Sequence, residues 1–305
     1  VNYYIKDTTE KVPGIIDNPV TGKGYLDQNI KVDHPASTKG YIVCINQPEE
    51  LTITAEENVV NVYYEKGIFA YEVHYYYESK DTVTENSIEA VYKSALLDSE
   101  IPFSTTESKV YDGHTYAYDR FEAKNTDGED GKPIVTADAS NNIVNVYYSL
   151  DEIGNNPENP TKPNKPDGTP DKYQLVFTYV AEDHGKVTGT VAEVITRQKD
   201  GENFSTKNPA YPEAAVTATP DSGYNFVNWT SDNPSEASKN IVAVLSRVLQ
   251  RYSATNAEFA DVDEIRNAGF TKDTEFTAHF IASDATTYKV EAVSYTHLTL
   301  PTNSL

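Results

Sequence analysis

The chain has 305 residues, of which 25 are Lys or Arg and 47 are Asp or Glu, so its formal net charge is −22. Such an acidic surface repels nucleic-acid phosphates and anionic lipid headgroups, which excludes binding to nucleic acid or membranes through a basic patch. The single cysteine, Cys44, and the lack of Cys and His at zinc-ligand spacing exclude an internal disulfide and a structural zinc. No apolar run approaches the roughly 20 residues that cross a bilayer, so we expect no membrane insertion within these residues.

The first two predicted units are related by an internal repeat. Residues 58–64, NVVNVYY, recur as NIVNVYY at 142–148. Apolar and polar residues alternate in both copies, which is typical of a half-buried strand with Val60, Val62 and Tyr64 on one face. These segments are therefore predicted to be the closing strands of two equivalent units.

The opening strands of the two units match as well. Residues 1–6 resemble residues 71–78, and both segments have the period of two expected of a strand. A turn glycine, Gly40 in the first unit and Gly113 in the second, precedes a further strand. The second unit is longer, and its extra residues are predicted at 122–133, at the tip of a hairpin where an insertion costs little.

Residues 151–172 interrupt this pattern with five prolines and no aliphatic residue after Ile153. Proline-rich sequence favours extended polyproline II, at ~3.1 Å per residue, which gives a span on the order of 60 Å for this segment. We therefore expect a spacer between the second unit and the next one.

The third predicted unit opens with alternating residues at 173–179 and closes with a similar strand at 274–280. Between them, residues 237–251 carry apolar side chains at helical spacing after Ser235, an N-cap candidate, with Ser238 as a second choice. This pattern predicts an amphipathic helix inserted between strands. The acidic run of Asp261, Asp263 and Glu264 indicates a solvated surface.

The end of the chain does not read like the rest. Residues 293–302, VSYTHLTLPT, back-translate into DNA similar to the transposon-end adapter of sequencing libraries. Residues 293–305 are therefore predicted to be translated adapter, and residues 283–292 to be a linker or the start of a further repeat. Because the chain starts at Val1 and contains no methionine, we also expect it to be an internal fragment whose signal peptide and anchor lie elsewhere.

The first two units resemble MucBP-type repeats, the modules of bacterial mucin-binding surface proteins. The resemblance rests on VNYYI at 1–5, GYIV at 40–43, QPEELTI at 47–53 and VNVYY at 60–64. The second unit keeps the two ends of this pattern and replaces its central Gln-Pro stretch.

The third unit is similar to internalin B repeats and their relatives, which carry a Gly-Tyr-x-Phe-x-Gly-Trp signature. Gly223, Tyr224, Phe226 and Trp229 match it, whereas Asn228 stands where glycine is usual. Together the two resemblances imply a Gram-positive, cell-wall-attached adhesin or its stalk, built of ubiquitin-like β-grasp modules. Mucin or glycan binding is a property of some members, and no catalytic residue or cofactor belongs to these families.

Three tyrosines are the candidates for glycan stacking: Tyr63, Tyr76 and Tyr147. Strand alternation places their rings opposite the core, where an aromatic face can stack on a sugar and nearby carboxylates and amides can accept hydroxyls. The alternative is that these rings only cover the sheet, a common role of tyrosine in strands.

Two further candidate sites are weaker. Residues 125–131, NTDGEDG, resemble a calcium loop, but the glycine falls one position late and no Glu closes the loop, so a plain turn is predicted. Lys6 and Asn61 lie on strands predicted to be adjacent, which would suit a Lys–Asn isopeptide bond. No nucleophile, acid–base or metal pattern stands out, so we predict no catalytic residue, no cofactor and no metal.

The predicted fold is mostly β, with tandem small β-grasp-like modules, a Pro-rich linker and one helical insertion. The predicted function is a non-catalytic fragment of an extracellular, cell-wall-associated adhesin that binds host mucin or other glycans, with no specific oligomer. The alternative is a passive stalk of a larger surface protein or of a cell-wall-attached polysaccharide-degrading enzyme. The predicted segments are 1–66 and 69–150 (MucBP-like repeats), 151–172 (linker), 173–282 (bacterial surface repeat), 283–292 and 293–305.

Overall fold

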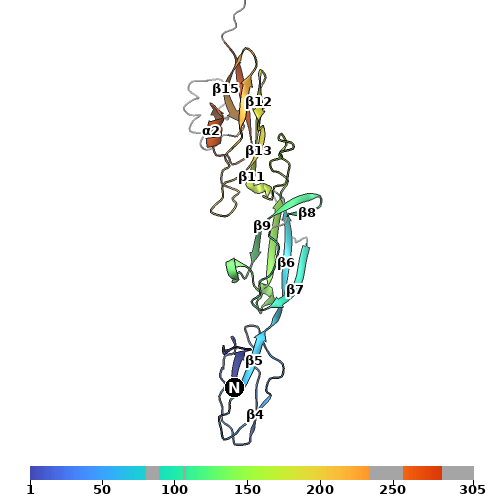
Figure 1. The fold of residues 1–305 in the computed structure, drawn as a ribbon, viewed down its shortest axis with the longest axis vertical. Helices are drawn as coiled ribbons and strands as arrows, with labels where there is room; N and C mark the ends of the chain where they lie inside the picture. The colour runs from blue at the N-terminus through green and yellow to red at the C-terminus, as the bar shows by residue number, and fades with distance from the viewer. Residues whose placement is uncertain (80–88, 106–107, 234–256, 284–305) are drawn as a thin grey trace, which may run out of the picture. The chain divides into compact units, whose positions relative to one another are not determined.

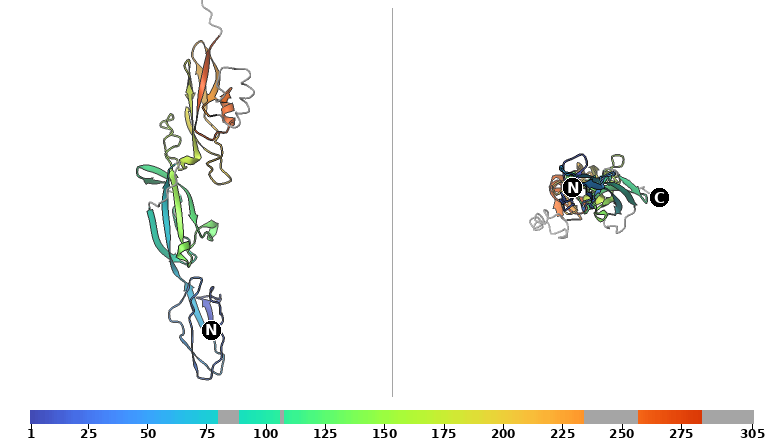
Figure 2. Two further views of the ribbon diagram at one scale, coloured as in Figure 1. Left: turned by 180° about the vertical axis from the view of Figure 1, so that it is seen from behind. Right: turned by 90° about the horizontal axis from the view of Figure 1, so that it is seen from below.

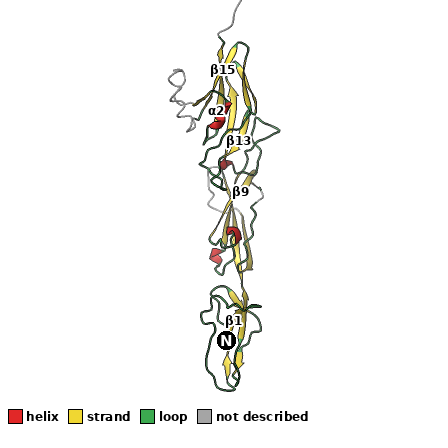
Figure 3. Ribbon diagram, turned by 60° about the vertical axis from the view of Figure 1, so that its left-hand side comes forward, coloured by secondary structure: helices red, strands yellow, loops and turns green. Residues whose placement is uncertain are grey.

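The computed structural model describes residues 1–79, 89–105, 108–233 and 257–283. The chain divides into two compact units, the first made of Val1–Ile153 and Pro166–Lys172, the second of Gly154–Lys165 and Tyr173–Leu305. Strands dominate both units (Figure 3), which confirms the mostly β fold. The helix predicted at 237–251, the segment 284–292 and the adapter-like tail lie outside the described residues.

The first unit begins with a small module, residues 1–66, that has its own sheets and core. Its three-stranded sheet has the order β1-β5-β3, and β2 pairs with β4. β1 and β5 are parallel, with Tyr3 opposite Val62. Val60, Val62 and Tyr64 are buried with Tyr3, as the alternation predicted. The strands are β1 (Asn2–Ile5), β2 (Asn29–Lys31), β3 (Tyr41–Val43), β4 (Glu50–Thr52) and β5 (Asn61–Lys66).

The second module, residues 68–150, has a five-stranded sheet with the order β7-β6-β10-β9-β8. Figure 1 shows β6 between β7 and β9 in this view, and the pairing places β10 beside β6, parallel to it, with Val73 opposite Val144. Asp112 and Gly113, both with positive φ, form the two-residue turn between β8 and β9. The elements are β6 (Ile68–Glu78), β7 (Glu89–Leu96), β8 (Lys109–Tyr111), β9 (His114–Ala123), β10 (Ile143–Leu150) and the 3-10 turns η1 (Glu129–Gly131) and η2 (Ala139–Asn141).

A β-bulge in β9 changes which residues face the core. Arg120 pairs with Tyr147 and Tyr118 with Tyr148, so Asp119 is the extra residue of the bulge. Tyr118 and Phe121 consequently both pack against the core although they are three positions apart. The bulge also brings Asp119 next to Arg120 on the outer face, where both take part in the ion cluster described below.

The third module, residues 173–283, repeats the same pairing around a larger core. Its sheet has the order β13-β11-β17-β15-β16, with β11 parallel to β17, and β12 pairs with β14. Phe177, Trp229 and Phe276 lie at the centre of its core. The elements are η3 (Asp171–Tyr173), β11 (Gln174–Ala181), β12 (Gly185–Gly189), β13 (Ala192–Thr196), β14 (Val216–Pro220), β15 (Tyr224–Ser231), β16 (Ala257–Phe259), α2 (Val262–Asn267) and β17 (Thr274–Ala282).

The short helix α2 forms where the acidic run indicated only a solvated surface. The carboxylate of Asp261 caps the helix by accepting from the backbone N–H groups of Asp263 and Glu264, at 2.9 and 3.0 Å. Ile265 is fully buried in the core of the module. Figures 1 and 2 accordingly show α2 against one side of this sheet.

The prediction of an extended spacer at 151–172 is wrong. The two carboxylate oxygens of Asp151 accept from the backbone N–H groups of Asp167 and Gly168, at 3.0 and 2.9 Å. One carboxylate oxygen of Asp171 accepts from the backbone N–H groups of Glu152 and Ile153, at 2.9 and 3.1 Å. Both aspartates are buried and require donors, so the two ends of the segment are held together and the proline content does not extend it.

Candidate functional site

A cavity of about 520 Å³ lies at one end of the first module and contains Tyr63. Its walls come from the turn after β1, the loop after β3, and β5 itself. We call it the Tyr63 pocket. Its lining residues are Lys6, Asp7, Thr8, Cys44, Ile45, Gln47, Tyr63 and Glu65.

Backbone pairing fixes the loop that carries half of the Tyr63 pocket. The N–H of Cys44 donates to the carbonyl of Tyr63 at 2.9 Å. The side-chain oxygen of Gln47 accepts from the N–H of Tyr63 at 2.8 Å, and its amide nitrogen donates to the carbonyl of Ile45 at 3.3 Å. The side chain of Gln47 therefore takes the place of a paired strand residue beside β5.

The chemistry of the Tyr63 pocket suits a neutral, amphipathic ligand. Tyr63 is half-buried and Ile45 is 85% exposed, so the pocket offers apolar surface for the less polar face of a sugar ring. Asp7 and Glu65 supply acceptors and Lys6 supplies donors, with two negative charges against one positive. Burial, and then the charge of Glu65, raise the pKa of the Cys44 thiol, which favours its protonated form.

The other two predicted stacking residues are together on the second module. The rings of Tyr76 and Tyr147 stack at 4.9 Å with an interplanar angle of 20°. The guanidinium of Arg120 lies 3.9 Å from the centre of the Tyr147 ring. Since β10 lies between β6 and β9, Tyr76 and Arg120 cover opposite faces of Tyr147, and this ring has no face for a sugar.

Next to this stack lies a buried ion cluster that the sequence analysis missed, formed by Glu78, Asp119, Arg120, Ser149 and Lys172. Arg120 donates to both carboxylate oxygens of Glu78 at 3.0 Å, and to Asp119 at 2.7 Å. The ammonium of Lys172 lies 2.6 Å from Asp119 and 3.2 Å from Glu78. The hydroxyl of Ser149 lies 3.3 Å from the same two carboxylates.

The ion cluster contains two carboxylates and two cations, and all of these side chains except that of Arg120 are largely buried. The carboxylate side chains of Glu78 and Asp119 are 4% and 2% exposed, and that of Lys172 is 16% exposed. Burial favours a raised pKa for Glu78, but the hydrogen bonds from Arg120 and the charge of Lys172 outweigh it and lower that pKa. The hydrogen bonds to Glu78 correspondingly raise the pKa of Arg120. Glu78 is therefore an ionised carboxylate beside a lysine.

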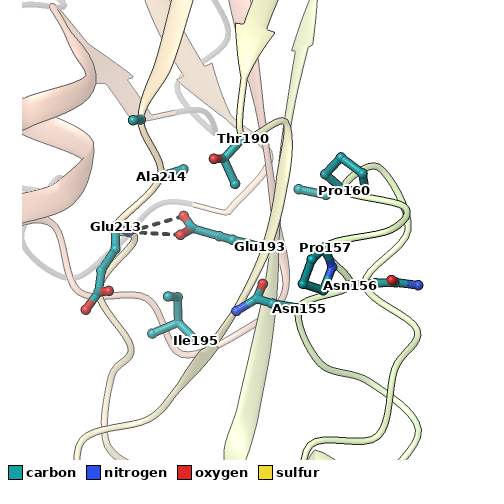
Figure 4. A pocket seen from close by; sticks show the side chains of 11 residues that line it. Asn155, Asn156, Pro157, Pro160, Thr190, Glu193, Ile195, Glu213 and Ala214 are labelled. Carbon is teal, nitrogen blue, oxygen red and sulfur yellow. Dashed lines mark hydrogen bonds between the residues drawn. The ribbon is translucent and has the colours of Figure 1, made fainter.

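A second cavity, of about 440 Å³, lies in the third module beside β13 (Figure 4). Its floor carries Glu193, which is buried and accepts from the hydroxyl of Tyr179 at 2.9 Å. The N–H of Glu213 donates to both oxygens of Glu193 at 3.2 Å, and Pro157 and Pro160 lie across the strand. Burial raises the pKa of Glu193. Because protein donors occupy this carboxylate, its arrangement is that of a structural link between β13 and residues 213–215.

The third module also contains three polar side chains that are connected like a hydrolase triad. The hydroxyl of Thr230 lies 2.7 Å from Nε2 of His279, whose Nδ1 lies 2.9 Å from the carboxylate of Glu182. Thr230 and His279 are both buried on the sheet, at 6% and 8% exposure. A nucleophile must reach its substrate, so this burial favours a structural role.

Neither the candidate isopeptide pair nor the calcium-like loop forms a site among the residues that the structure describes. Asn2, rather than Lys6, lies opposite Asn61 and donates to its side chain at 3.0 Å, while Lys6 lies beyond the pairing of Ile5 with Tyr64. The described geometry therefore does not bring together Lys6 and Asn61, the candidate pair for an isopeptide bond. In the loop at 125–131 the side chain of Asn125 accepts from the N–H of Asp127, as in a plain turn. Among the described residues no three His, Cys, Asp or Glu are grouped to hold a metal.

Comparison with known proteins identifies one segment of the chain. Residues 175–260 match the family model described as "Divergent InlB B-repeat domain". The match covers less than half of the chain and lies in the third module, where the resemblance to internalin B repeats was expected. It identifies a bacterial surface repeat, which fits an extracellular or surface location.

The other comparisons give no relatives. No curated protein and no solved structure matches the chain. Within the part of the chain that the structure describes, no helix has the length and apolarity needed to span a membrane.

Proposed function

We propose that this chain is a non-catalytic, load-bearing repeat region of an adhesin on a Gram-positive cell wall. The observation that carries the proposal is shared by all three modules: the first and last strands are parallel neighbours. The pairs are β1 with β5, β6 with β10, and β11 with β17. The bacterial surface repeat in the third module supports the same role.

Parallel pairing of the terminal strands resists a pulling force. The force enters a module at the start of its first strand and leaves at the end of its last strand. Because the two strands run in the same direction, this load slides one along the other and strains all the hydrogen bonds between them together. The opposite arrangement, in which both ends lie at one edge, breaks the bonds one at a time. Forced unfolding is governed by the rate of unfolding, which this geometry slows.

The MucBP resemblance of the first two modules is part of this proposal. In both, the closing strand lies between the opening strand and the strand that follows the turn glycine, with the same parallel and antiparallel senses. This common topology supports a duplication, as the repeated NVYY sequence does. Single-molecule pulling of the chain by its two ends tests the load-bearing role, and a module that extends without a resolvable force peak contradicts it.

The Tyr63 pocket favours a second function, the binding of host glycans such as those of mucin. Its combination of a half-buried ring, an exposed Ile45 and two carboxylates suits a neutral sugar, because sialylated or sulfated sugars meet the negative charges of Asp7 and Glu65. Of the predicted stacking residues, Tyr63 lines a cavity, whereas the ring of Tyr147 is covered by Tyr76 and Arg120.

A glycan array with the whole chain tests this second function. We expect a saturable signal with neutral glycans that Tyr63→Ala reduces at least tenfold and Tyr147→Ala leaves unchanged. If the folded wild-type chain gives no signal at high protein concentration, the glycan-binding function is contradicted and the load-bearing role alone remains. Equal loss in the two variants assigns binding to a surface other than the Tyr63 pocket.

A further inference from the structure

We propose that the ion cluster of the second module forms an intramolecular isopeptide bond between the amine of Lys172 and the side-chain carboxyl of Asp119. The Nζ atom of Lys172 lies 2.6 Å from an Asp119 oxygen, in direct contact with the carboxyl group that it would attack. Glu78 lies 3.2 Å from the same Nζ atom. Three elements bring these groups together: the end of β6, the bulge of β9, and the turn η3.

The neighbouring side chains have the positions that the condensation requires. Glu78, as a carboxylate, accepts a proton from the Lys172 ammonium, and the neutral amine attacks the carboxyl carbon of Asp119. Arg120 and Ser149 donate to an Asp119 oxygen, at 2.7 and 3.3 Å, and stabilise the negative charge of the tetrahedral intermediate. Glu78 passes on two protons in turn, the one taken from the ammonium and one from the nitrogen of the tetrahedral intermediate, to the departing oxygen, which leaves as water. One C–O bond breaks, one C–N bond forms, and one water leaves.

Burial shifts this reaction towards the amide. In water, an ammonium and a carboxylate are strongly solvated, and that solvation opposes their condensation. In the ion cluster both ions have lost most of their water, at 16% and 2% side-chain exposure, whereas the amide carries no charge to desolvate. The two groups are also held in contact, which supplies the high effective concentration of an intramolecular reaction.

The bond would change how the second module carries load. Residues 120–171, which include β10 and both buried aspartates of the proline-rich segment, would lie inside a covalent loop closed by Asp119 and Lys172. A pulling force would pass through the bond and bypass that loop. The chemistry itself does not depend on the load-bearing role, and it is tested without any measurement of force.

The test is the intact mass of the whole chain under denaturing conditions. We expect the wild-type mass to be below the sequence mass by one water. Digestion should yield a branched peptide that joins the segments around Asp119 and Lys172. A wild-type mass equal to that of the sequence, or a loss of water located at any other pair, overturns the proposal.

Variants separate this bond from other sources of mass loss. Lys172→Arg and Asp119→Ala should have their full sequence masses. Asp119→Asn should lose one ammonia in place of one water, because the leaving group is then an amide nitrogen. Glu78→Gln should keep the full mass while remaining folded by circular dichroism. The control is Asp98→Ala, which breaks the exposed 2.9 Å ion pair with Lys66 and should leave the loss of one water intact.

Discussion

Replacing Glu193 with alanine should destabilise the third module by roughly 2–4 kcal/mol. The carboxylate accepts from the hydroxyl of Tyr179 and the backbone N–H of Glu213, and Tyr179 is itself only 3% exposed. Removal of the carboxylate leaves the Tyr179 hydroxyl buried without its acceptor, at a cost of about 1–3 kcal/mol. The loss of packed side-chain atoms adds to this cost, whereas water replaces the acceptor of the exposed Glu213.

The single tryptophan makes this prediction measurable in the whole chain. Trp229 is 2% exposed in the core of the third module, and its ring packs edge-on against Tyr179 at 5.9 Å. Its fluorescence therefore reports the unfolding of this module and is silent for the other two. With a urea slope of about 2 kcal/mol per molar, in the middle of the range for small proteins, the midpoint should fall by about 1–2 M.

The matched control is Glu213→Ala, which removes an exposed carboxylate and keeps the N–H that Glu193 accepts from. It should change stability by no more than ~0.5 kcal/mol. A Glu193→Ala midpoint within error of that control would refute the assignment of Glu193 as a structural link.

Two further predictions concern the same module. Burial raises the folded pKa of Glu193, so the stability that its protonated form contributes is complete below the ordinary Glu pKa of about 4.3 and is lost as the pH rises through the folded value. Denaturation followed by Trp229 fluorescence between acid and neutral pH should show this decline in the wild type and a smaller one in Glu193→Gln; identical slopes would argue against it. Gly189 has φ of +101°, and a Cβ there would overlap the carbonyl oxygen of Ala215. Gly189→Ala should cost at least about 2 kcal/mol, while Gly201→Ala, with positive φ and open space, should cost less, and equal midpoints would contradict this.

The strands that the sequence predicted best are those whose signal is local. In β5 and β10 Val and Tyr alternate with polar residues. This alternation is enough to predict the strand, the face of the sheet on which each side chain lies, and the core residues, because the pleat alone decides which side chains are buried. The cap of α2 was also readable, since Asp261 stands three residues before Glu264 in the pattern of a capping box. It was missed because the acidic run was interpreted as surface charge.

The ion cluster was beyond sequence reasoning for two physical reasons. Arg120 is 42 residues from Glu78, and Lys172 is 53 residues from Asp119, so no local spacing links them. The bulge at Asp119, which has no sequence signal of its own, then brings that side chain into the cluster. The proline-rich segment was mispredicted because composition describes an isolated chain, and here Asp151 and Asp171 fix its ends.

The load-bearing account is tested most directly by pulling the first module in two directions. With Cys44→Ser in the background, one handle is attached at the N-terminus and the other at a cysteine replacing either Lys66 or Asn61. The Lys66 position loads β1 and β5 in opposite senses along their length, whereas Asn61 lies opposite Asn2 at the same end of the pair. The account predicts a clearly higher rupture force through Lys66→Cys than through Asn61→Cys, and equal forces in the two directions would contradict it.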